Sequence, residues 1–421
     1  MKTAHPLFVI GAGPKAASLS AKNKVLRDCK IKVPEVYVLE SKEIAANWSG
    51  EHGYTSGMQR LGTPPEKDIG FPYRLDKKNE IITKNLLAEF SWISYLMSRG
   101  KFGQWIDRGR PHPTHKEWAD YLSTVLNKSA DRIIIGNVRK IVAIDDHWSL
   151  TVDVKDGGKR DFKASGIVFT GPGPRKVPRT LQLEEVRIEQ HPRILFGDDF
   201  WTRLDTLNQI QAGDDEPAIV VVGGGETAAS IVSYLIDKFS NRKISIVVLT
   251  RSGTLFSRGE GYYENRMFTE QATWQNLPET LRHEIINRGD RGVISVDAAK
   301  KIACSHNVEH RFMGVTKLSR DKGNDQLLWI NGVLQCQLVV FALGFDAFWF
   351  RDLFEHNHRK IFSTEQSCTQ IQETLRHDLS VTHHEIRGKL YLPMISAFAQ
   401  GPGFPNLSCL GDLSDRILGR N

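Results

Sequence analysis

The chain has 421 residues, of which 40% are hydrophobic and 25% charged, with 35 glycines and 17 prolines. This composition is typical of a loop-rich globular protein of two or three domains, and it excludes a disordered or fibrous chain. The net charge of +7 comes from 56 Lys and Arg against 49 Asp and Glu. Because these cations are scattered along the chain, the charge favours small anionic ligands over nucleic acid.

The hydrophobic runs and the cysteines indicate the cellular location of the protein and exclude one class of flavoenzyme. The longest apolar runs, such as 219–222 and 338–343, are only long enough for strands, so no membrane span is expected. The apolar run that begins at Leu7 stops at Gly11, which leaves no signal-peptide core and predicts a cytoplasmic protein. Five cysteines without a C-x-x-C pair argue against a disulfide reductase.

Residues 7–16 predict a buried strand, a glycine turn and the start of a helix. The G-x-G-x-x-A spacing allows a tight turn, a close approach of a pyrophosphate to the backbone, and tight packing of helix on strand. The helix N-terminus then directs free N–H groups at the phosphates. The next predicted strand ends at Glu40, whose carboxylate suits the ribose hydroxyls of FAD or NAD; a solvated strand-end charge is the alternative. The candidate residues of this turn are Gly11, Gly13, Pro14, Lys15 and Ala16.

The same pattern of a buried strand, a glycine turn and a helix start recurs at residues 218–228. Here the following predicted strand ends in Arg251 and Ser252, and a cation at this place accommodates the 2′-phosphate of NADPH. Arg258 is a second candidate for that phosphate, and an ordinary surface arginine is the alternative. The candidate residues of this turn are Gly223, Gly225, Glu226 and Thr227.

Two nucleotide motifs in one chain are typical of a flavoprotein that takes hydride from a nicotinamide. We therefore predict an α/β fold with two Rossmann-like dinucleotide-binding domains, for FAD and NADPH, the second inserted into the first. The predicted segments are 1–195 and 341–421 for the FAD domain and 215–340 for the NADPH domain. The polar residues from 182 to 216 are interpreted as a linker.

Several loop strings are more specific than the glycine turns; they lie at 46–48, 60–73, 105–111, 255–261, 290–293 and 400–409. With these strings the sequence resembles the flavin-dependent N-hydroxylating monooxygenases, and most closely the lysine N6-hydroxylases of the mycobactin and nocobactin type. The resemblance covers nearly the whole chain. It implies that substrate binds in the cleft between the two domains.

The resemblance also implies individual roles. Asn265 falls where the family contacts the amino-acid substrate and the nicotinamide. Further FAD-binding positions are implied at Asn47, Trp48, Gln59, Val138, Gln400 and Leu407.

Two positions depart from the ornithine hydroxylases. This chain has Pro64 where those enzymes carry a lysine, and Arg291-Gly292 where they carry an asparagine-tyrosine pair. Both missing residues hold the substrate carboxylate there, so ornithine is disfavoured. Lys67 or Arg291 is the candidate replacement, and a surface charge is the alternative for each.

The implied reaction is NADPH- and O2-dependent N-hydroxylation of the side-chain amine of L-lysine, or of a lysine derivative, through a C4a-hydroperoxyflavin, for hydroxamate siderophore biosynthesis. Since the flavin carries the chemistry, neither a dedicated catalytic residue nor a metal is predicted. Ornithine or a diamine as substrate, and an FAD/NADPH oxidase without oxygenation, are the alternatives. Baeyer–Villiger oxygenation is disfavoured because the histidine expected after Phe169 is missing. The sequence leaves open whether the chain forms a homo-oligomer.

Overall fold

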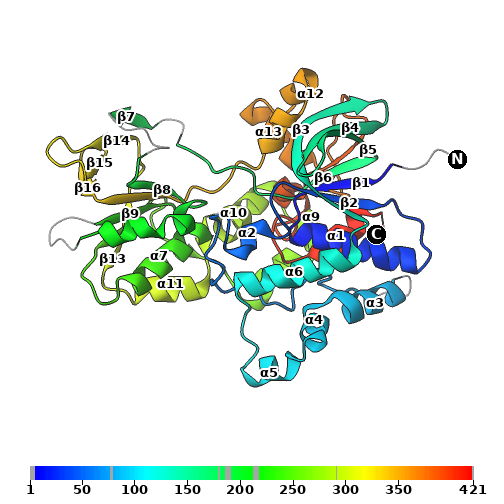
Figure 1. The fold of residues 1–421 in the computed structure, drawn as a ribbon, viewed down its shortest axis with the longest axis horizontal. Helices are drawn as coiled ribbons and strands as arrows, with labels where there is room; N and C mark the ends of the chain where they lie inside the picture. The colour runs from blue at the N-terminus through cyan, green and yellow to red at the C-terminus, as the bar shows by residue number, and fades with distance from the viewer. Residues whose placement is uncertain are drawn as a thin grey trace.

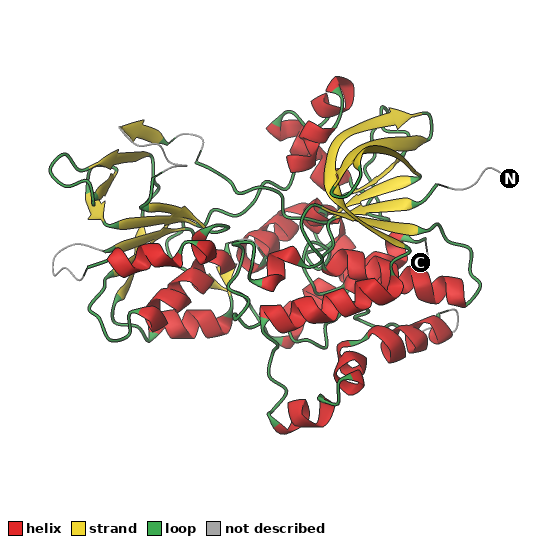
Figure 2. Cartoon of the chain, viewed as in Figure 1, coloured by secondary structure: helices red, strands yellow, loops and turns green. Residues whose placement is uncertain are grey.

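The computed structural model describes residues 5–75, 79–178, 181–184, 191–211, 218–290 and 292–419. Figure 1 shows two β-sheet regions at opposite ends of the long axis, with helices packed between and below them. Both sheets have helices on their faces, as Figure 2 shows. This mixture of parallel strands and covering helices confirms the predicted α/β class with two Rossmann-like units.

The first sheet has seven strands in the order β18-β6-β1-β2-β3-β4-β5. Strands β18, β6, β1, β2 and β3 pair in parallel, and β3, β4 and β5 form an antiparallel meander. The C-terminal β18 pairs with β6, so the chain returns to its first sheet after building the second. The strands are β1 (Leu7–Ile10), β2 (Val36–Glu40), β3 (Arg132–Ile144), β4 (His147–Val154), β5 (Gly158–Ala164), β6 (Gly166–Phe169) and β18 (Lys389–Tyr391).

Successive side chains of β1 point to opposite faces of the sheet, and each face packs into a separate hydrophobic core. Leu7 and Val9 face one core, and Phe8 and Ile10 face the other, as the period of two in a strand requires. Both faces are covered, which is why the strand reads as a continuous apolar run. The covering helices are α1 (Pro14–Asp28), α6 (His115–Ser129) and α15 (Leu410–Ile417). A lower group in Figure 1 comprises α3 (Glu80–Phe90), α4 (Trp92–Ser98) and α5 (Phe102–Asp107).

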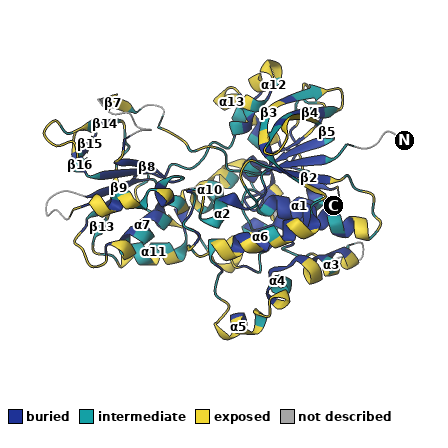
Figure 3. Cartoon of the chain, in the orientation of Figure 1, coloured by how far each residue is buried: buried dark blue, intermediate teal, exposed yellow. Residues whose placement is uncertain are grey.

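The second sheet has five parallel strands in the order β13-β10-β9-β17-β8. Strands β8, β9, β10 and β17 are buried at every position, as Figure 3 shows for the middle of the sheet, whereas the edge strand β13 is partly exposed. The five strands are β8 (Ile194–Phe196), β9 (Ile219–Val222), β10 (Ile246–Thr250), β13 (Val308–Phe312) and β17 (Leu338–Phe341). Helices α7 (Glu226–Lys238) and α11 (Val296–Ala303) pack together beside it. A four-stranded sheet beside it consists of β7 (Gln182–Glu184), β14 (Lys317–Arg320), β15 (Leu328–Ile330) and β16 (Leu334–Cys336). Strands β11 (Phe256–Ser257) and β12 (Val293–Ile294) form a separate two-stranded sheet.

The linker predicted for 182–216 is wrong for the described residues 191–211. They contain β8 and two short 3-10 helices, η1 (Phe200–Thr202) and η2 (Leu204–Gln209). Apolar side chains spaced among the polar ones, Phe200 and Leu207 among them, are buried in the core of the second sheet. The boundaries of the predicted domains stay predictions.

Helices from both parts of the chain meet between the sheets. Trp274 donates its indole N–H to the carbonyl of Phe398 over 2.9 Å, which joins a helix of the inserted segment to one of the C-terminal segment. The helices of the two segments are α8 (Tyr262–Thr269), α9 (Gln271–Gln275), α10 (Glu279–Gly289), η3 (Trp349–Leu353), α12 (His356–Lys360), α13 (Glu365–Thr374), η4 (Pro393–Ile395) and α14 (Ala397–Gln400). Of these, η3 packs against β3 of the first sheet. None of the helices among the described residues has the length and hydropathy needed to cross a membrane.

The burial of β17 predicts a stability effect. Leu338→Ala, at a side chain with no exposed surface, should lower the free energy of unfolding by about 2–5 kcal/mol because it leaves a cavity in the second core. Val333→Ala, at a side chain that is 68% exposed, should change it by less than about 0.5 kcal/mol. Urea unfolding followed by tryptophan fluorescence compares the two. Equal effects of both substitutions would contradict the packing described for this sheet.

Candidate functional site

The first glycine turn has the geometry of a pyrophosphate site. Gly11 has a φ of +103°, and a Cβ there would lie 2.6 Å from Oγ1 of Thr170, so the turn needs glycine for its own folding. Gly13 is the N-cap of α1, and a Cβ there would meet nothing within 4 Å. The space in front of this helix N-terminus therefore fits the phosphates of FAD.

Glu40 lies where the sequence predicts it, at the end of β2 beside the glycine turn. Its Oε2 accepts a hydrogen bond from the backbone N–H of Ala12 over 2.9 Å, and its Oε1 accepts one from Lys42 over 3.0 Å. These bonds fix the carboxylate at the end of β2 beside the turn, and its role toward the ribose of FAD stays a prediction.

Lys15 follows the turn and is buried. Its Nζ donates to the carbonyl oxygen of Pro405 over 2.7 Å, which ties α1 to the loop at 401–409 that carries Leu407. Burial lowers the pKa of Lys15 to about 8, while Cys409 and Asp290 act in the opposite direction. An anionic phosphate beside this group would favour its charged form.

The short helix α2 (Ala46–Ser49) carries Asn47 and Trp48, and the indole of Trp48 lies 4.8 Å from the ring of His115, centroid to centroid. Burial lowers the pKa of His115 to about 4, so this imidazole is neutral near pH 7. Its Nδ1 lies 2.9 Å from Oγ1 of Thr55, which also bonds Gln59. Thr55 thereby links Gln59 to His115 at the start of α6, and the ring of His115 packs on Trp48 of α2. No motif in the sequence pointed to His115.

The remaining predicted FAD residues have structural partners. Gln400 is buried, donates to the carbonyl of Leu375 over 2.8 Å and accepts from Arg416 over 2.9 Å, so both ends of its amide are used by the protein. Val138 lies in β3 opposite Val152. Leu407 packs against the core under α1.

The second glycine turn repeats the first at the start of α7. Gly223 has a φ of +142°, and a Cβ there would lie 2.3 Å from the carbonyl oxygen of Ala342. At Gly225 the nearest atom to a Cβ is 3.9 Å away, so space is open in front of this helix as well. Glu226 accepts hydrogen bonds from the backbone N–H of Ser295 over 2.7 Å and from its hydroxyl over 3.0 Å.

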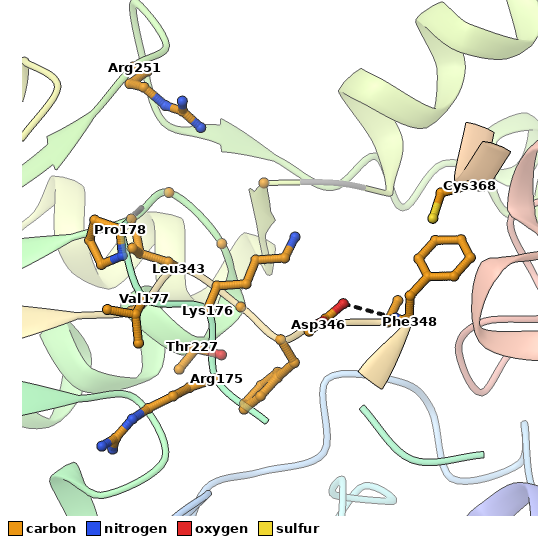
Figure 4. Close-up of a pocket in the computed structure, with 18 of the residues that line it drawn as sticks. Arg175, Lys176, Val177, Pro178, Thr227, Arg251, Leu343, Asp346, Phe348 and Cys368 are labelled. Atoms are coloured by element: carbon orange, nitrogen blue, oxygen red, sulfur yellow. Dashed lines mark hydrogen bonds between the residues drawn. The ribbon is translucent and has the colours of Figure 1, made fainter. Parts of the chain in front are cut away.

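A cavity of about 2080 Å³ opens at this second turn. Its lining includes Gly223, Gly225, Glu226, Thr227, Arg251 and Ser252, which the sequence predicts as the NADPH site. It is larger than an ordinary small-molecule pocket, which suits a dinucleotide. In Figure 4, Arg251 lies at one side of the cavity and Lys176 extends its amine into it, whereas Arg175 points away.

Lys176 was missed in the sequence. It follows Gly171-Pro-Gly-Pro-Arg after strand β6, and its backbone N–H donates to the carbonyl of Gly344 over 2.9 Å. The sequence feature that could have identified Lys176 is a basic residue next to a turn rich in glycine and proline. Arg175 does not share its role, because that guanidinium pairs with Asp198 at 3.2 Å and Asp199 at 3.0 Å.

Arg258 does not line the cavity that holds Arg251. Its backbone N–H donates to the carbonyl of Ile294 over 2.7 Å, and the next residue, Ser295, bonds Glu226 beside the second glycine turn. Its assignment to the 2′-phosphate stays a prediction. The positive charge of Arg258 also lowers the pKa of Lys67.

Lys67 and Asn265, predicted from distant parts of the chain, lie together. The Nζ of Lys67 donates to Oδ1 of Asn265 over 2.7 Å, across 198 residues of sequence. The loop at 60–73 from the first part of the chain thus meets α8 of the inserted segment. Arg291, the other candidate, lies outside the described residues.

One cluster, two of whose residues (His283 and Glu373) line the cavity at the second turn, has ligand atoms close enough to share a cation. Glu279, His283 and Glu373 bring one ligand atom each to within 4.8 Å of one another. Two of the three are exposed, and exposed acidic groups often lie this close without a metal. The expectation that the protein needs no metal stays a prediction.

Comparison with known proteins agrees with this arrangement. Residues 82–306 match the family model of L-lysine 6-monooxygenase/L-ornithine 5-monooxygenase. The L-lysine N6-monooxygenase MbtG of Mycolicibacterium paratuberculosis is 37% identical over 98% of this chain and 95% of its own length, and MbtG of Mycobacterium tuberculosis (strain H37Rv) is 36% identical over 98% and 94%.

Solved structures give the same result. The lysine monooxygenase NbtG of Nocardia farcinica is 34% identical, covers 98% of each chain and has a TM-score of 0.77. The ornithine N-hydroxylase KtzI of Kutzneria sp. 744, solved with reduced FAD, NADP⁺ and L-ornithine, has a TM-score of 0.73 over 99% of this chain and 98% of its own, at 16% identity, and supports the fold. The NADPH domain of NbtG and the FAD and NADP⁺ bound to KtzI agree with the predicted cofactors, FAD and NADPH. The chain belongs to the L-lysine 6-monooxygenase/L-ornithine 5-monooxygenase family.

Proposed function

We propose that this protein hydroxylates the side-chain amine of L-lysine, or of a lysine derivative, with NADPH and O2 as co-substrates and FAD as cofactor. The observation that carries the proposal is the bond between Lys67 and Asn265, because it brings together two candidate substrate residues from the two parts of the chain. The names of the relatives at 34–37% identity support lysine as the amino acid.

The overall reaction balances as amine, NADPH, H⁺ and O2 giving hydroxylamine, NADP⁺ and water. Bound FAD supplies the transfer of electrons from NADPH to oxygen. The protein has three tasks, which are to hold two dinucleotides, to keep water away and to present an uncharged amine.

Two helix N-termini hold the dinucleotides. In this proposal α1 and the turn at Gly13 bind the pyrophosphate of FAD, with Lys15 beside it and Glu40 on the ribose. The turn at Gly225 and the start of α7 bind the pyrophosphate of NADPH. Arg251 and Lys176 bind its 2′-phosphate, since both cations border the same cavity.

The amine must lose its proton before it reacts, because an ammonium has no lone pair. With an ordinary pKa near 10.4, only about one lysine side chain in 10³ is neutral at pH 7. An apolar, dehydrated site lowers that pKa.

Two finer statements complete the proposal. The hydroxylated lysine serves hydroxamate siderophore biosynthesis, and the protein acts in the cytoplasm. Both rest on the sequence and on the class of enzyme, and the sequence leaves open whether the chain forms a homo-oligomer.

Amine-dependent product formation tests the proposal. Purified protein should be yellow, and NADPH consumption in air should yield a hydroxylamine with L-lysine, at about one product per NADPH. Hydrogen peroxide is measured in parallel. Peroxide alone with L-lysine, L-ornithine and cadaverine would show an oxidase and contradict the proposal.

A further inference from the structure

The loop that ends at Gln59 is fixed to the start of α6 by backbone and side-chain hydrogen bonds. The backbone N–H of His115 donates to the carbonyl of Gln59 over 2.8 Å. Thr55 is buried, and its hydroxyl lies between Nδ1 of His115, at 2.9 Å, and Oε1 of Gln59. Side chains from two separate parts of the sequence therefore form one continuous chain of hydrogen bonds.

The side-chain amide of Gln59 is held in one orientation. Its Oε1 accepts from the backbone N–H of Ser56 over 3.0 Å and from the Ser56 hydroxyl over 2.9 Å, and it also contacts the hydroxyl of Thr55. A backbone N–H can only donate, so the atom that it meets is the carbonyl oxygen of the amide. Among the hydrogen bonds of the described residues, none uses Nε2 of Gln59. Both N–H groups of this amide are therefore available to a ligand.

The same reasoning assigns the ring proton of His115. Thr55 has one hydroxyl proton, and because Oε1 of Gln59 can only accept, Thr55 donates this proton to Gln59. The imidazole must then donate in its contact with Thr55. Burial lowers the pKa of His115 to about 4, so the ring is neutral near pH 7 and carries its one proton on Nδ1. Donation thus runs from His115 through Thr55 to Gln59.

This network is connected to the first glycine turn. The backbone N–H of Ala45, directly before α2, donates to the carbonyl of Ala12 in that turn over 3.0 Å. Within α2, the indole of Trp48 meets the ring of His115 with 4.8 Å between the centroids and 77° between the planes. The turn predicted for the pyrophosphate of FAD is thus linked through α2 and His115 to the unused N–H groups of Gln59.

We infer that His115 is a positioning residue, which acts through Thr55 to hold the amide N–H groups of Gln59 toward the flavin ring of FAD. This inference rests on the proposed function and names a residue that lies outside the glycine motifs and the loop strings of the sequence. The flavin ring carries nitrogen and oxygen acceptors at its edge, which a fixed amide donor matches. Reduction adds negative charge to the ring, and a hydrogen bond to a charged acceptor is stronger than one to a neutral acceptor. The network therefore favours FAD binding and raises the reduction potential of the bound flavin.

Two measurements on each variant test this role: fluorescence titration of the apoprotein with FAD, and the reduction potential of the bound flavin. His115→Phe keeps a ring beside Trp48 and removes the donor. Its affinity for FAD should fall about 2- to 10-fold, as expected for one neutral hydrogen bond, and its potential should become more negative. Thr55→Val removes the hydroxyl at nearly constant volume and should give the same two changes. His115→Asn, whose amide can donate in place of Nδ1, and Thr55→Ser should restore most of the loss.

His112→Phe is the matched control. The Nδ1 of His112 lies 2.7 Å from the carbonyl oxygen of Leu61, so this substitution also removes an imidazole hydrogen bond to the neighbouring loop. It leaves the side chain of Gln59 untouched, and both measurements should stay near their wild-type values. The melting temperature of each apoprotein shows that the variant is folded.

A double variant separates a positioning role from a purely structural one. In a Gln59→Leu background, His115→Phe should cause no further change in FAD affinity or in potential, because the amide that His115 orients is gone. Additive losses would overturn the assignment. Wild-type affinity and potential in both His115→Phe and Thr55→Val would overturn it as well.

These measurements need no amine, so they separate this inference from the proposed function. If the protein forms a hydroxylamine from none of the amines tested, the proposed function fails, and the FAD titration still decides the role of His115. If the variants match the wild type in both measurements while the protein hydroxylates L-lysine, this inference alone fails.

Discussion

Replacing Gly13 with valine is expected to abolish FAD binding while leaving the protein folded. A Cβ at this position meets no protein atom within 4 Å, and the backbone there is extended, with a φ of −99°. The fold therefore does not require glycine at this position. The dinucleotide does, because its pyrophosphate must approach the backbone and the N-terminus of α1. We expect the affinity for FAD to fall by at least about 100-fold, beyond the effect of losing one charged hydrogen bond.

Absorbance and fluorescence titration of the apoprotein with FAD measures the effect. Gly11→Val is the informative contrast, because it forces a side chain onto a φ of +103° and against Thr170 and should destabilise the apoprotein itself. Gly103→Val is the matched control, in α5 and also with open space around it, and should leave the affinity unchanged. Gly13→Val protein that still binds FAD with wild-type affinity would show that the open space is not the pyrophosphate site.

The local parts of the fold could be predicted from the sequence because each depends on neighbouring residues. The runs at 7–10 and 219–222 are apolar at every position, which indicates strands buried on both faces, and the glycine spacing after each marks the turn into a helix. Sheet order and the strand at 194–196 could not be predicted. That strand is three residues long and depends on β17, more than a hundred residues later, for its hydrogen bonds.

The residues of the candidate site also fall into those that could be predicted from the sequence and those that could not. Motif positions such as Gly13, Glu40 and Arg251 follow from spacing alone. The contact of Lys67 with Asn265 is a property of the fold, although each residue was a candidate by itself. Lys176 was missed because only the folded chain shows that a basic residue after β6 reaches the cavity at α7.

Arg251→Ala is expected to remove much of the preference for NADPH over NADH. Arg251 is exposed at the end of β10 and borders the cavity, and its aliphatic carbons lie close to Gly314 rather than in the core. Its loss should therefore affect phosphate binding and not stability. A charged hydrogen bond to the 2′-phosphate is worth about 1.5–3 kcal/mol, so kcat/KM for NADPH should fall about 10- to 100-fold. NADH has no 2′-phosphate, and its kcat/KM should stay within about twofold.

Substitution of Lys176 gives a second test of the same 2′-phosphate site. If both cations bind one phosphate, Lys176→Ala should also lower kcat/KM for NADPH alone, and the double variant should lose less than the sum of the two free-energy changes, because the groups share a partner. Arg242→Ala removes an exposed cation just before β10, outside the cavity lining, and should leave both cofactors unaffected. Steady-state kinetics with NADPH and NADH at saturating amine decides the matter. An unchanged NADPH to NADH ratio in Arg251→Ala and in Lys176→Ala would place the 2′-phosphate elsewhere, since no other contact of NADPH distinguishes it from NADH.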